Sequence, residues 1–280
     1  MTLKFVKMEG IGNDFILTHN VSERRIESLR EKIAFLCDRR RGVGADGLIL
    51  VLPSKTADYR MRIFNSDGSE AEMCGNGIRC FTLYLKKTGL LKKKRLTVET
   101  LAGIIQTEIS GMVIKVNMGP PILEAPLIPV ARQSGRVIME PIAVDGEYFK
   151  VTAVSMGNPH AVVYADILCD ELVLEKGKKL ESHPFFPKKA NIEFVKVISR
   201  KEITMRVFER GCGETMACGT GACAAVVSGI VNNKNDNRVT VHLLGGDLAI
   251  EWDGELQHPV YMTGPARWIF KGDIVLDAVF

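Results

Sequence analysis

The sequence predicts an α+β (mixed α/β) protein with two pseudo-symmetric, barrel-like domains, each a β-sheet wrapped around a central helix. Three observations support this fold class. The chain repeats itself at about half its length, both halves show the same order of strands and helix, and a Gly-Pro pair stands at each crossing between the halves. A repeat of this length indicates internal duplication of one structural unit.

The repeat centres on two cysteines. Cys74 and Cys218 each follow a phenylalanine by ten residues, each opens a Cys-Gly-x-Gly tetrapeptide, and their residue numbers differ by 144. Three further landmarks recur in the same order at an offset of 145: Gly12-Asn13 with Gly157-Asn158, Asp46 with Asn191, and Gly119-Pro120 with Gly264-Pro265. Chance similarity does not produce four ordered matches of this kind.

In each half, apolar strands precede a glycine turn and a helix. The first half shows strands at residues 5–8, 48–52, 61–64 and 96–100, and a helix from Cys74 to about Lys87. The second shows strands at 161–164, 192–197 and 203–208, and a helix from Cys218 to about Val231. The second helix is apolar nearly all round, so we expect it to be buried.

The domain boundaries follow from the Gly-Pro landmarks, because such pairs mark turns between elements. The chain crosses between halves at residues 117–121 and again at 262–265. A strand pattern at residues 274–279 is expected to return to the first half. The first domain is therefore expected to be discontinuous, residues 1–118 plus 267–280, and the second to span residues 119–266.

Composition excludes several classes of partner. A net charge of +4 from 37 basic and 33 acidic residues makes no long-range field, so no nucleic acid is expected. No apolar stretch reaches the ~18–20 residues of a membrane span, and the N-terminus does not resemble a signal peptide, so we expect a cytoplasmic protein without a membrane partner. Seven cysteines without a CxxC spacing are expected to be thiols, not metal ligands. Whether the chain forms a homodimer stays open.

The two cysteines are expected to be an acid–base pair. Free N–H groups and the positive dipole end at a helix start stabilise an anion and lower a thiol pKa from ~8.5 into the range of ~3.5–7.5. One cysteine as thiolate would remove an α-proton while the other, as thiol, donates a proton to the opposite face. The backbone amides of Gly75-Asn76 and Gly219-Thr220 would hold the α-carboxylate. This predicts an amino-acid racemase or epimerase acting on a small-molecule substrate with no cofactor and no metal.

With these motifs in place, the sequence resembles the diaminopimelate epimerase family along its entire length. The resemblance is carried by the segments at residues 7–15, 64–69, 74–77, 156–160, 190–192, 209–211, 213–215, 217–222 and 262–265. It implies a two-domain fold and the interconversion of LL- and meso-diaminopimelate on the route to lysine and peptidoglycan. It also implies that Cys74 and Cys218 are the acid–base pair.

The resemblance assigns further residues to the site. Asn13 and Glu209 would lie near the reacting centre, with Glu209 a partner for the ammonium group. Arg210 would read the distal amino-acid end of the substrate together with three asparagines, Asn65, Asn158 and Asn191. A second carboxylate suits a bidentate arginine, and a distal ammonium suits amide oxygens.

Some positions keep two interpretations. His160 matches a family position near the site, and a purely structural histidine is the alternative. Gly47 stands where some family members use a glutamine near the substrate, and glycine cannot make that side-chain contact. We expect Cys212 to have no role in the reaction, because the equivalent position of the other half carries no reactive residue.

Three other functions remain as alternatives. A proline or hydroxyproline racemase of the same architecture would have no distal carboxylate for Arg210. A thiol–disulfide oxidoreductase could use Cys74 and Cys218 as a redox pair. Redox chemistry, however, does not need two separate helix N-termini with glycines that can bind a carboxylate. A non-catalytic amino-acid-binding protein would have no need for paired cysteines, and exchange of the substrate α-hydrogen with deuterium would distinguish it.

Overall fold

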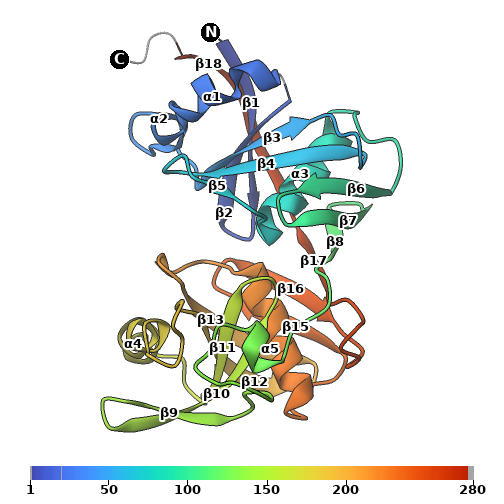
Figure 1. Cartoon of the computed structure of the whole chain (residues 1–280). Helices are drawn as coiled ribbons and strands as arrows, with labels where there is room; N and C mark the ends of the chain where they lie inside the picture. Colours follow the sequence, from blue (N-terminus) through green and yellow to red (C-terminus); the bar gives the residue numbers. More distant parts are fainter. Residues whose placement is uncertain (1, 20, 277–280) are drawn as a thin grey trace. The chain divides into compact units, whose positions relative to one another are not determined.

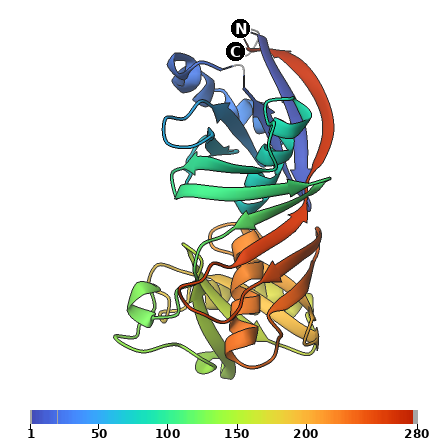
Figure 2. The ribbon, with the colours of Figure 1, turned by 90° about the vertical axis from the view of Figure 1, so that its right-hand side faces the viewer.

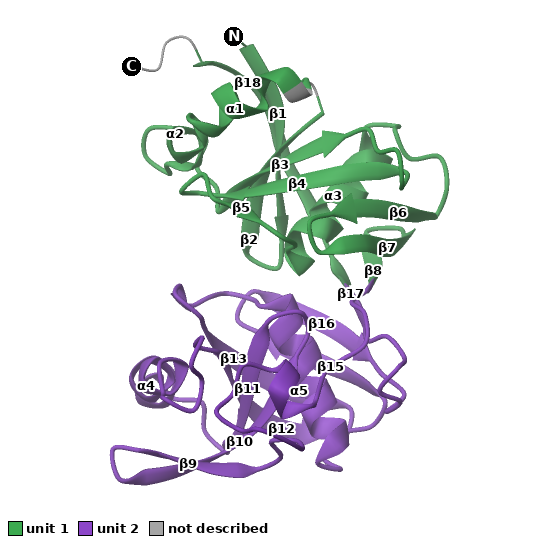
Figure 3. Cartoon of the chain, in the orientation of Figure 1, with its two compact units in different colours: residues 1–116, 264–280 green, residues 117–263 purple. Residues whose placement is uncertain are grey.

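A computed structural model describes residues 2–19 and 21–276. The chain divides into two compact units (Figure 3): residues 1–116 with 264–280, and residues 117–263. These boundaries lie two and three residues before the positions expected from the sequence. Within the described residues, none of the helices combines the length and apolarity that crossing a membrane requires.

The first unit is a mixed sheet around helix α3 (Gly75–Lys87). Its strands follow the order β18–β1–β2–β3–β4–β6–β7–β8, with β2–β3 and β4–β6 parallel and the other pairs antiparallel. The strand bounds are β1 Thr2–Gly10, β2 Asn13–Thr18, β3 Gly47–Leu52, β4 Tyr59–Asn65, β5 Glu70–Ala71, β6 Arg95–Thr100, β7 Gly103–Ser110, β8 Val113–Asn117 and β18 Arg267–Val275. Short helices η1 (Glu23–Arg25), α1 (Ile26–Arg30) and α2 (Ile33–Cys37) connect β2 to β3.

The second unit has the same arrangement around α5 (Gly219–Val231). Its strand order is β9–β10–β11–β12–β13–β15–β16–β17. As in the first unit, two pairs are parallel, here β11–β12 and β13–β15, and the others are antiparallel. The bounds are β9 Glu140–Val144, β10 Glu147–Ser155, β11 Pro159–Tyr164, β12 Asn191–Ser199, β13 Glu202–Glu209, β14 Gly213–Glu214, β15 Arg238–Leu243, β16 Gly246–Glu251 and β17 Tyr261–Pro265. Helical segments η2 (Ala125–Leu127), η3 (Glu171–Lys176) and α4 (Gly177–Glu181) complete the unit (Figure 1).

The repeat extends to individual ion pairs. Arg62 of β4 binds Glu70 of β5 through two hydrogen bonds of 2.7 Å. At an offset of 144, Arg206 of β13 binds Glu214 of β14 at 2.7 and 2.9 Å. Each pair fastens the hairpin that leads into a central helix, and a bidentate arginine–carboxylate contact fixes geometry as well as charge. The predicted fold class, two duplicated mixed α/β halves, is confirmed.

The strand expected at residues 274–279 begins earlier in the structure. Strand β18 starts at Arg267 and runs antiparallel to β1 along most of its length (Figure 2). Its start was missed because Ile269 and Phe270 are both half-exposed, so the segment lacks a simple inward apolar alternation. Residues 277–279 of the expected strand lie outside the described part of the chain.

Both central helices are buried; burial of the second was predicted from its apolar composition. In α5 every residue from Gly221 to Gly229 is buried, and α3 buries its first eleven residues, Gly75 to Leu85. The strands that cover them are equally apolar, with Leu48 and Ile49 on β3 fully buried. Each helix start is therefore held by a packed core, which fixes the position of the cysteine that precedes it.

Candidate active site

Cys74 caps the N-terminus of α3. Its backbone is extended (φ −139°), and its sulfur accepts the N–H of Gly77 at 3.4 Å. A Cβ on Gly77 would come within 3.1 Å of the side chains of Ile49 and Ile63, so glycine lets this helix start lie tightly against β3 and β4. The half-buried thiol is thus held at the end of the helix where unpaired N–H groups gather.

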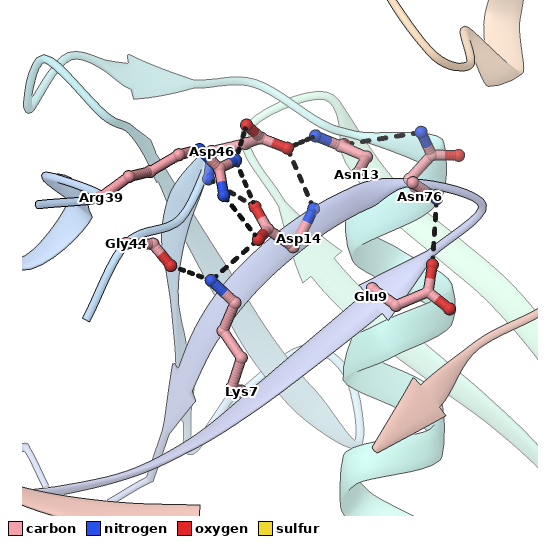
Figure 4. Close-up of polar contacts among 9 residues, drawn as sticks. Lys7, Glu9, Asn13, Asp14, Arg39, Gly44, Asp46 and Asn76 are labelled. Carbon is pink, nitrogen blue, oxygen red and sulfur yellow. Dashed lines mark hydrogen bonds and ion pairs between the residues drawn. The ribbon is translucent and has the colours of Figure 1, made fainter. Parts of the chain in front are cut away.

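Asn13 lies beside this cysteine. The Cys74 thiol donates to Asn13 Oδ1 at 3.6 Å, and the Asn76 amide donates to the same oxygen at 3.4 Å. The Asn13 amide donates in turn to Asp46 Oδ2 at 2.6 Å (Figure 4). The structure therefore brings three of the proposed site residues, Asn13, Cys74 and Asn76, together, and adds Asp46 as the group that orients Asn13.

Asp46 belongs to an ionic network that the sequence did not reveal (Figure 4). Arg39 donates to both oxygens of Asp14 at 2.9 and 3.0 Å and to Asp46 at 2.8 Å, while Lys7 contacts Asp14 at 2.8 Å and the carbonyl oxygen of Gly44. Burial raises the pKa of Asp14, but hydrogen bonds from Arg39 and Lys7 outweigh it and lower that pKa to about 2. The network fixes Asp46, and through it Asn13.

The strand register corrects one landmark of the repeat. In the first unit Gly47 pairs with Asn65 across β3 and β4. In the second unit Ile192 pairs with Phe208, so Asn191 lies opposite Glu209, and both residues are 144 positions after Gly47 and Asn65. The counterpart of Asn191 is therefore Gly47, not Asp46. A Cβ on Gly47 would come 2.4 Å from the carbonyl oxygen of Phe64, so this backbone admits no side chain there. Asn65 is exposed, and its amide donates to Ser69 Oγ at 3.0 Å.

Cys218 caps α5 as Cys74 caps α3. Its sulfur accepts the N–H of Gly221 at 3.4 Å and lies 3.5 Å from the hydroxyl of Thr220. Unlike Cys74, it is buried. Burial raises the pKa of Cys218 well above its ordinary value, and the negative charges of Glu209 and Glu193 act in the same direction. The expectation that the helix start lowers the thiol pKa is therefore wrong for Cys218.

Gly75-Asn76 and Gly219-Thr220 occupy the first two positions of their helices. Backbone N–H groups at these positions have no acceptor within the helix, and they lie at its positive end. Each unit thus combines a thiol with the type of backbone site that binds a carboxylate. This arrangement can hold an amino acid and move a proton at its α-carbon.

His160, which had two interpretations, is fully buried in the second unit. Its Nδ1 lies 2.7 Å from Glu193 Oε1, and its Nε2 lies 2.9 Å from Asn158 Oδ1. The histidine therefore connects a predicted site residue, Asn158, to a buried carboxylate that the sequence analysis did not single out. Glu193 stands between Ile192 and Phe194 in a wholly buried part of β12. A charge inside such an apolar run was the signal that could have identified it.

Glu209 and Arg210 end strand β13 and begin the following turn. The Glu209 carboxylate accepts a hydrogen bond from the Thr215 hydroxyl. The Arg210 side chain is exposed, and its guanidinium donates to the carbonyl oxygen of Lys188 at 3.4 Å. The Arg210 backbone N–H donates to Asn191 Oδ1 at 2.9 Å.

A second residue missed from the sequence supports the same turn. Glu181, buried at the end of α4, accepts the backbone N–H of Gly211 at 3.0 Å and contacts Lys189 at 3.2 Å. It thereby braces the turn that carries Arg210. Among residues 2–19 and 21–276, no cluster of three or more His, Cys, Asp or Glu side chains is arranged to hold a metal ion.

Comparison with known proteins gives consistent results. A family model described as diaminopimelate epimerase matches residues 5–124 and 152–269. The chain is 52% identical over 280 residues to the diaminopimelate epimerase of Moorella thermoacetica, covering 98% of this chain and 100% of that protein. It is 50% identical over 281 residues to that of Acetivibrio thermocellus, covering 98% and 99%.

Solved structures share the fold at low sequence identity. A hydroxyproline epimerase from Agrobacterium vitis with bound trans-4-hydroxy-L-proline has a TM-score of 0.74 at 15% identity, covering 99% of this chain and 94% of that one. A Bacillus anthracis phenazine biosynthesis protein of the PhzF family has a TM-score of 0.69 at 18% identity, covering 99% and 100%. At this identity the likeness concerns the fold alone.

Proposed function

The chain belongs to the diaminopimelate epimerase family, and from that premise we propose which of its residues carry out the reaction. Its function is that of an isomerase, the epimerisation of diaminopimelate in lysine biosynthesis. The reaction inverts one stereocentre, so it needs a base on one face of the α-carbon and an acid on the other.

Cys74 and Cys218 supply these two groups in the proposal. The observation that carries it is their equivalence: each is the N-cap of a central helix of 13 residues, and each sulfur accepts an N–H at 3.4 Å. One sulfur removes the α-proton as a thiolate, and the other donates a proton as a thiol. Reversal of the two roles gives the reverse reaction.

The helix starts bind the reacting end of the substrate. We assign the α-carboxylate to the N–H groups of Gly75-Asn76 and Gly219-Thr220, where negative charge that develops on proton removal is also stabilised. Asn13, oriented by Asp46, contacts Cys74 and places an amide oxygen at the reacting centre. Glu209 is the partner for the α-ammonium group.

The distal end of the substrate carries a second carboxylate and a second ammonium group. Arg210, exposed on the turn after β13, is assigned to that carboxylate because a guanidinium can bind both of its oxygens. Asn65 and Asn158 are assigned to the distal ammonium group. The side chain of Asn191 accepts the backbone N–H of Arg210, so the part of Asn191 in substrate recognition is indirect.

One experiment tests the reaction and the substrate together. Reduced protein is incubated with LL-diaminopimelate in deuterium oxide, and the isomer ratio and α-deuteration are followed in time. We expect meso product whose new α-hydrogen comes from solvent, and no turnover of proline. Interconversion without solvent deuterium would contradict proton transfer by the two thiols. Because the mechanism requires reduced thiols, we also propose that the protein works in the reducing cytoplasm.

A further inference from the structure

The two half-sites differ in the residue beneath the helix start. In the first unit, the side chain under Gly77 is Ile49, which pairs with Ile63 across β3 and β4. In the second unit, Glu193 pairs with Val207 across β12 and β13, and it lies under Gly221. The offset between Ile49 and Glu193 is the 144 of the cysteines, so a buried apolar group in one half is replaced by a buried carboxyl group in the other.

The Glu193 carboxyl group lies close to the Cys218 sulfur. A Cβ built on Gly221 would be 2.8 Å from Glu193 Oε1 and 3.3 Å from Cys218 Sγ, so both atoms pack against the same point at the start of α5. Only the absence of a side chain at Gly221 allows this approach. At the equivalent point in the first unit, the Cys74 Cβ shares the space with two isoleucine methyl groups.

Glu193 is held by one partner on one side. Its Oε1 lies 2.7 Å from His160 Nδ1, and both side chains are completely buried. The second oxygen, Oε2, is buried and has no hydrogen-bond partner within the described chain. An incompletely paired carboxyl group in an apolar core costs stability, so its presence needs an explanation beyond packing.

The groups that face Cys218 come from each neighbouring element. Glu193 lies on β12 and Glu209 on β13, and a negative charge on either disfavours a thiolate at Cys218. Burial raises the pKa of Glu193, and its contact with His160 on β11 acts against that rise and favours the carboxylate. The Thr220 hydroxyl lies on α5 itself. Negative charge beside a sulfur disfavours a second negative charge on it. The carboxyl end of the Glu193–His160 pair faces the start of α5 at Gly221, which places the charge where it opposes a thiolate.

We propose that Glu193, paired with His160 and packed against the start of α5, keeps Cys218 in the thiol form in the resting enzyme. Cys218 is then the proton donor at rest and Cys74 the base. Glu193 acts through Cys218 and His160, so it is a positioning residue. The inference rests on the proposed assignment of the two cysteines as the acid–base pair.

The test measures the ionisation of each thiol separately. Alkylation by iodoacetamide is followed from pH 5 to pH 11 in the full-length protein, and the modified Cys74 and Cys218 peptides are quantified by mass spectrometry. The pH midpoint reports ionisation even where burial slows the reaction. In Glu193→Gln we expect the Cys218 midpoint to fall by about one pH unit, the scale of one nearby charge. The Cys74 midpoint should not move.

A second variant and a control keep the result decisive. Glu193→Ile gives the second half the residue type of the first and should shift the Cys218 midpoint in the same direction, whether or not Glu193→Gln folds. Ile49→Val, at the matched position of the first half, should leave the Cys218 midpoint in place. A Cys218 midpoint that is unchanged or raised in the folded Glu193 variants would overturn the proposal. Because alkylation needs no turnover, that outcome differs from failure of the cysteine variants to lose epimerase activity.

Discussion

The side-chain oxygen of Asn191 accepts the backbone N–H of Arg210 at 2.9 Å, while its amide group donates to the carbonyl oxygen of Pro159 at 3.1 Å. Asn191 is buried and Arg210 is exposed. The asparagine is therefore bonded to the backbone at both ends, and the arginine extends from a turn that the asparagine holds in place.

Asn191→Ala should weaken both the fold and substrate binding. It leaves the part-buried backbone N–H of Arg210 and the buried carbonyl oxygen of Pro159 without this partner, and a buried unsatisfied group costs about 1–3 kcal/mol. We expect the free energy of unfolding in urea to fall by that order and KM to rise more than kcat falls. Asn191→Asp retains the acceptor for Arg210 and should recover part of the KM effect. Unchanged stability in the alanine variant would show that the two hydrogen bonds are dispensable.

Removal of either catalytic thiol should abolish epimerisation without loss of the fold. Cys74→Ala and Cys218→Ala each remove one of the two proton-transfer groups, and such groups contribute about 10²–10⁴ in rate. Cys169→Ala, at an exposed cysteine, is the matched control and should keep full activity. The measurement is the rate of isomer interconversion with circular dichroism as the check on folding. More than a tenth of the normal rate in either variant would refute the two-thiol mechanism.

Arg210→Ala should reduce kcat/KM for diaminopimelate roughly 30-fold or more. This corresponds to a loss of about 2–5 kcal/mol of transition-state stabilisation, the scale of a broken charge pair. Arg210→Lys keeps the charge but not the two-pronged geometry and should fall between the alanine variant and the unaltered protein. Arg132→Ala removes another exposed arginine, one paired with Glu140, and serves as control. Equal kcat/KM values for Arg210→Ala and Arg132→Ala would place recognition of the distal carboxylate elsewhere.

Asp14 should stabilise the fold at neutral pH and lose this effect between about pH 4 and pH 2. Its pKa is lowered from 3.8 to about 2 in the folded protein, so the stability it contributes is complete above pH 4 and is lost as the pH falls through 2. Asp14→Asn should lower the free energy of unfolding at pH 7 by about 1–2 kcal/mol after solvent screening. Urea titrations at pH 7, 4, 3 and 2 should show the two proteins converging toward the acid end. A difference independent of pH would mean that charge on Asp14 is not the cause.

The parts of the site that depend on neighbouring residues could be predicted from the sequence. A Cys-Gly-x-Gly string defines its own helix start, because the cap, the close approach and the free N–H groups all lie within four residues. Cys74 and Cys218 were therefore identified with their structural roles. The duplication followed in the same way, since comparing the chain with itself requires no knowledge of contacts.

Contacts between distant residues could not be predicted in this way. Asp14 meets Arg39 and Asn13 meets Asp46 at sequence separations of 25 and 33 residues, and hydrophobic periodicity does not identify such partners. Glu193 was missed for another reason. The first part of β12 is buried on both faces, so alternation does not show which way a residue points, and the only signal was a charge within an apolar run.

The pairing of β1 with β18 has a consequence for how the protein is made. Thr2 pairs with Val275, so β1 cannot complete its pairing until β18 has been synthesised. The strands of the second unit lie between residues 140 and 265 and can form their sheet earlier, although their domain comes later in the chain. Until β18 is synthesised, β1 presents an unpaired edge to other nascent chains. We expect the order of folding to run opposite to the order of synthesis, with the domain of Cys218 completed before the domain of Cys74.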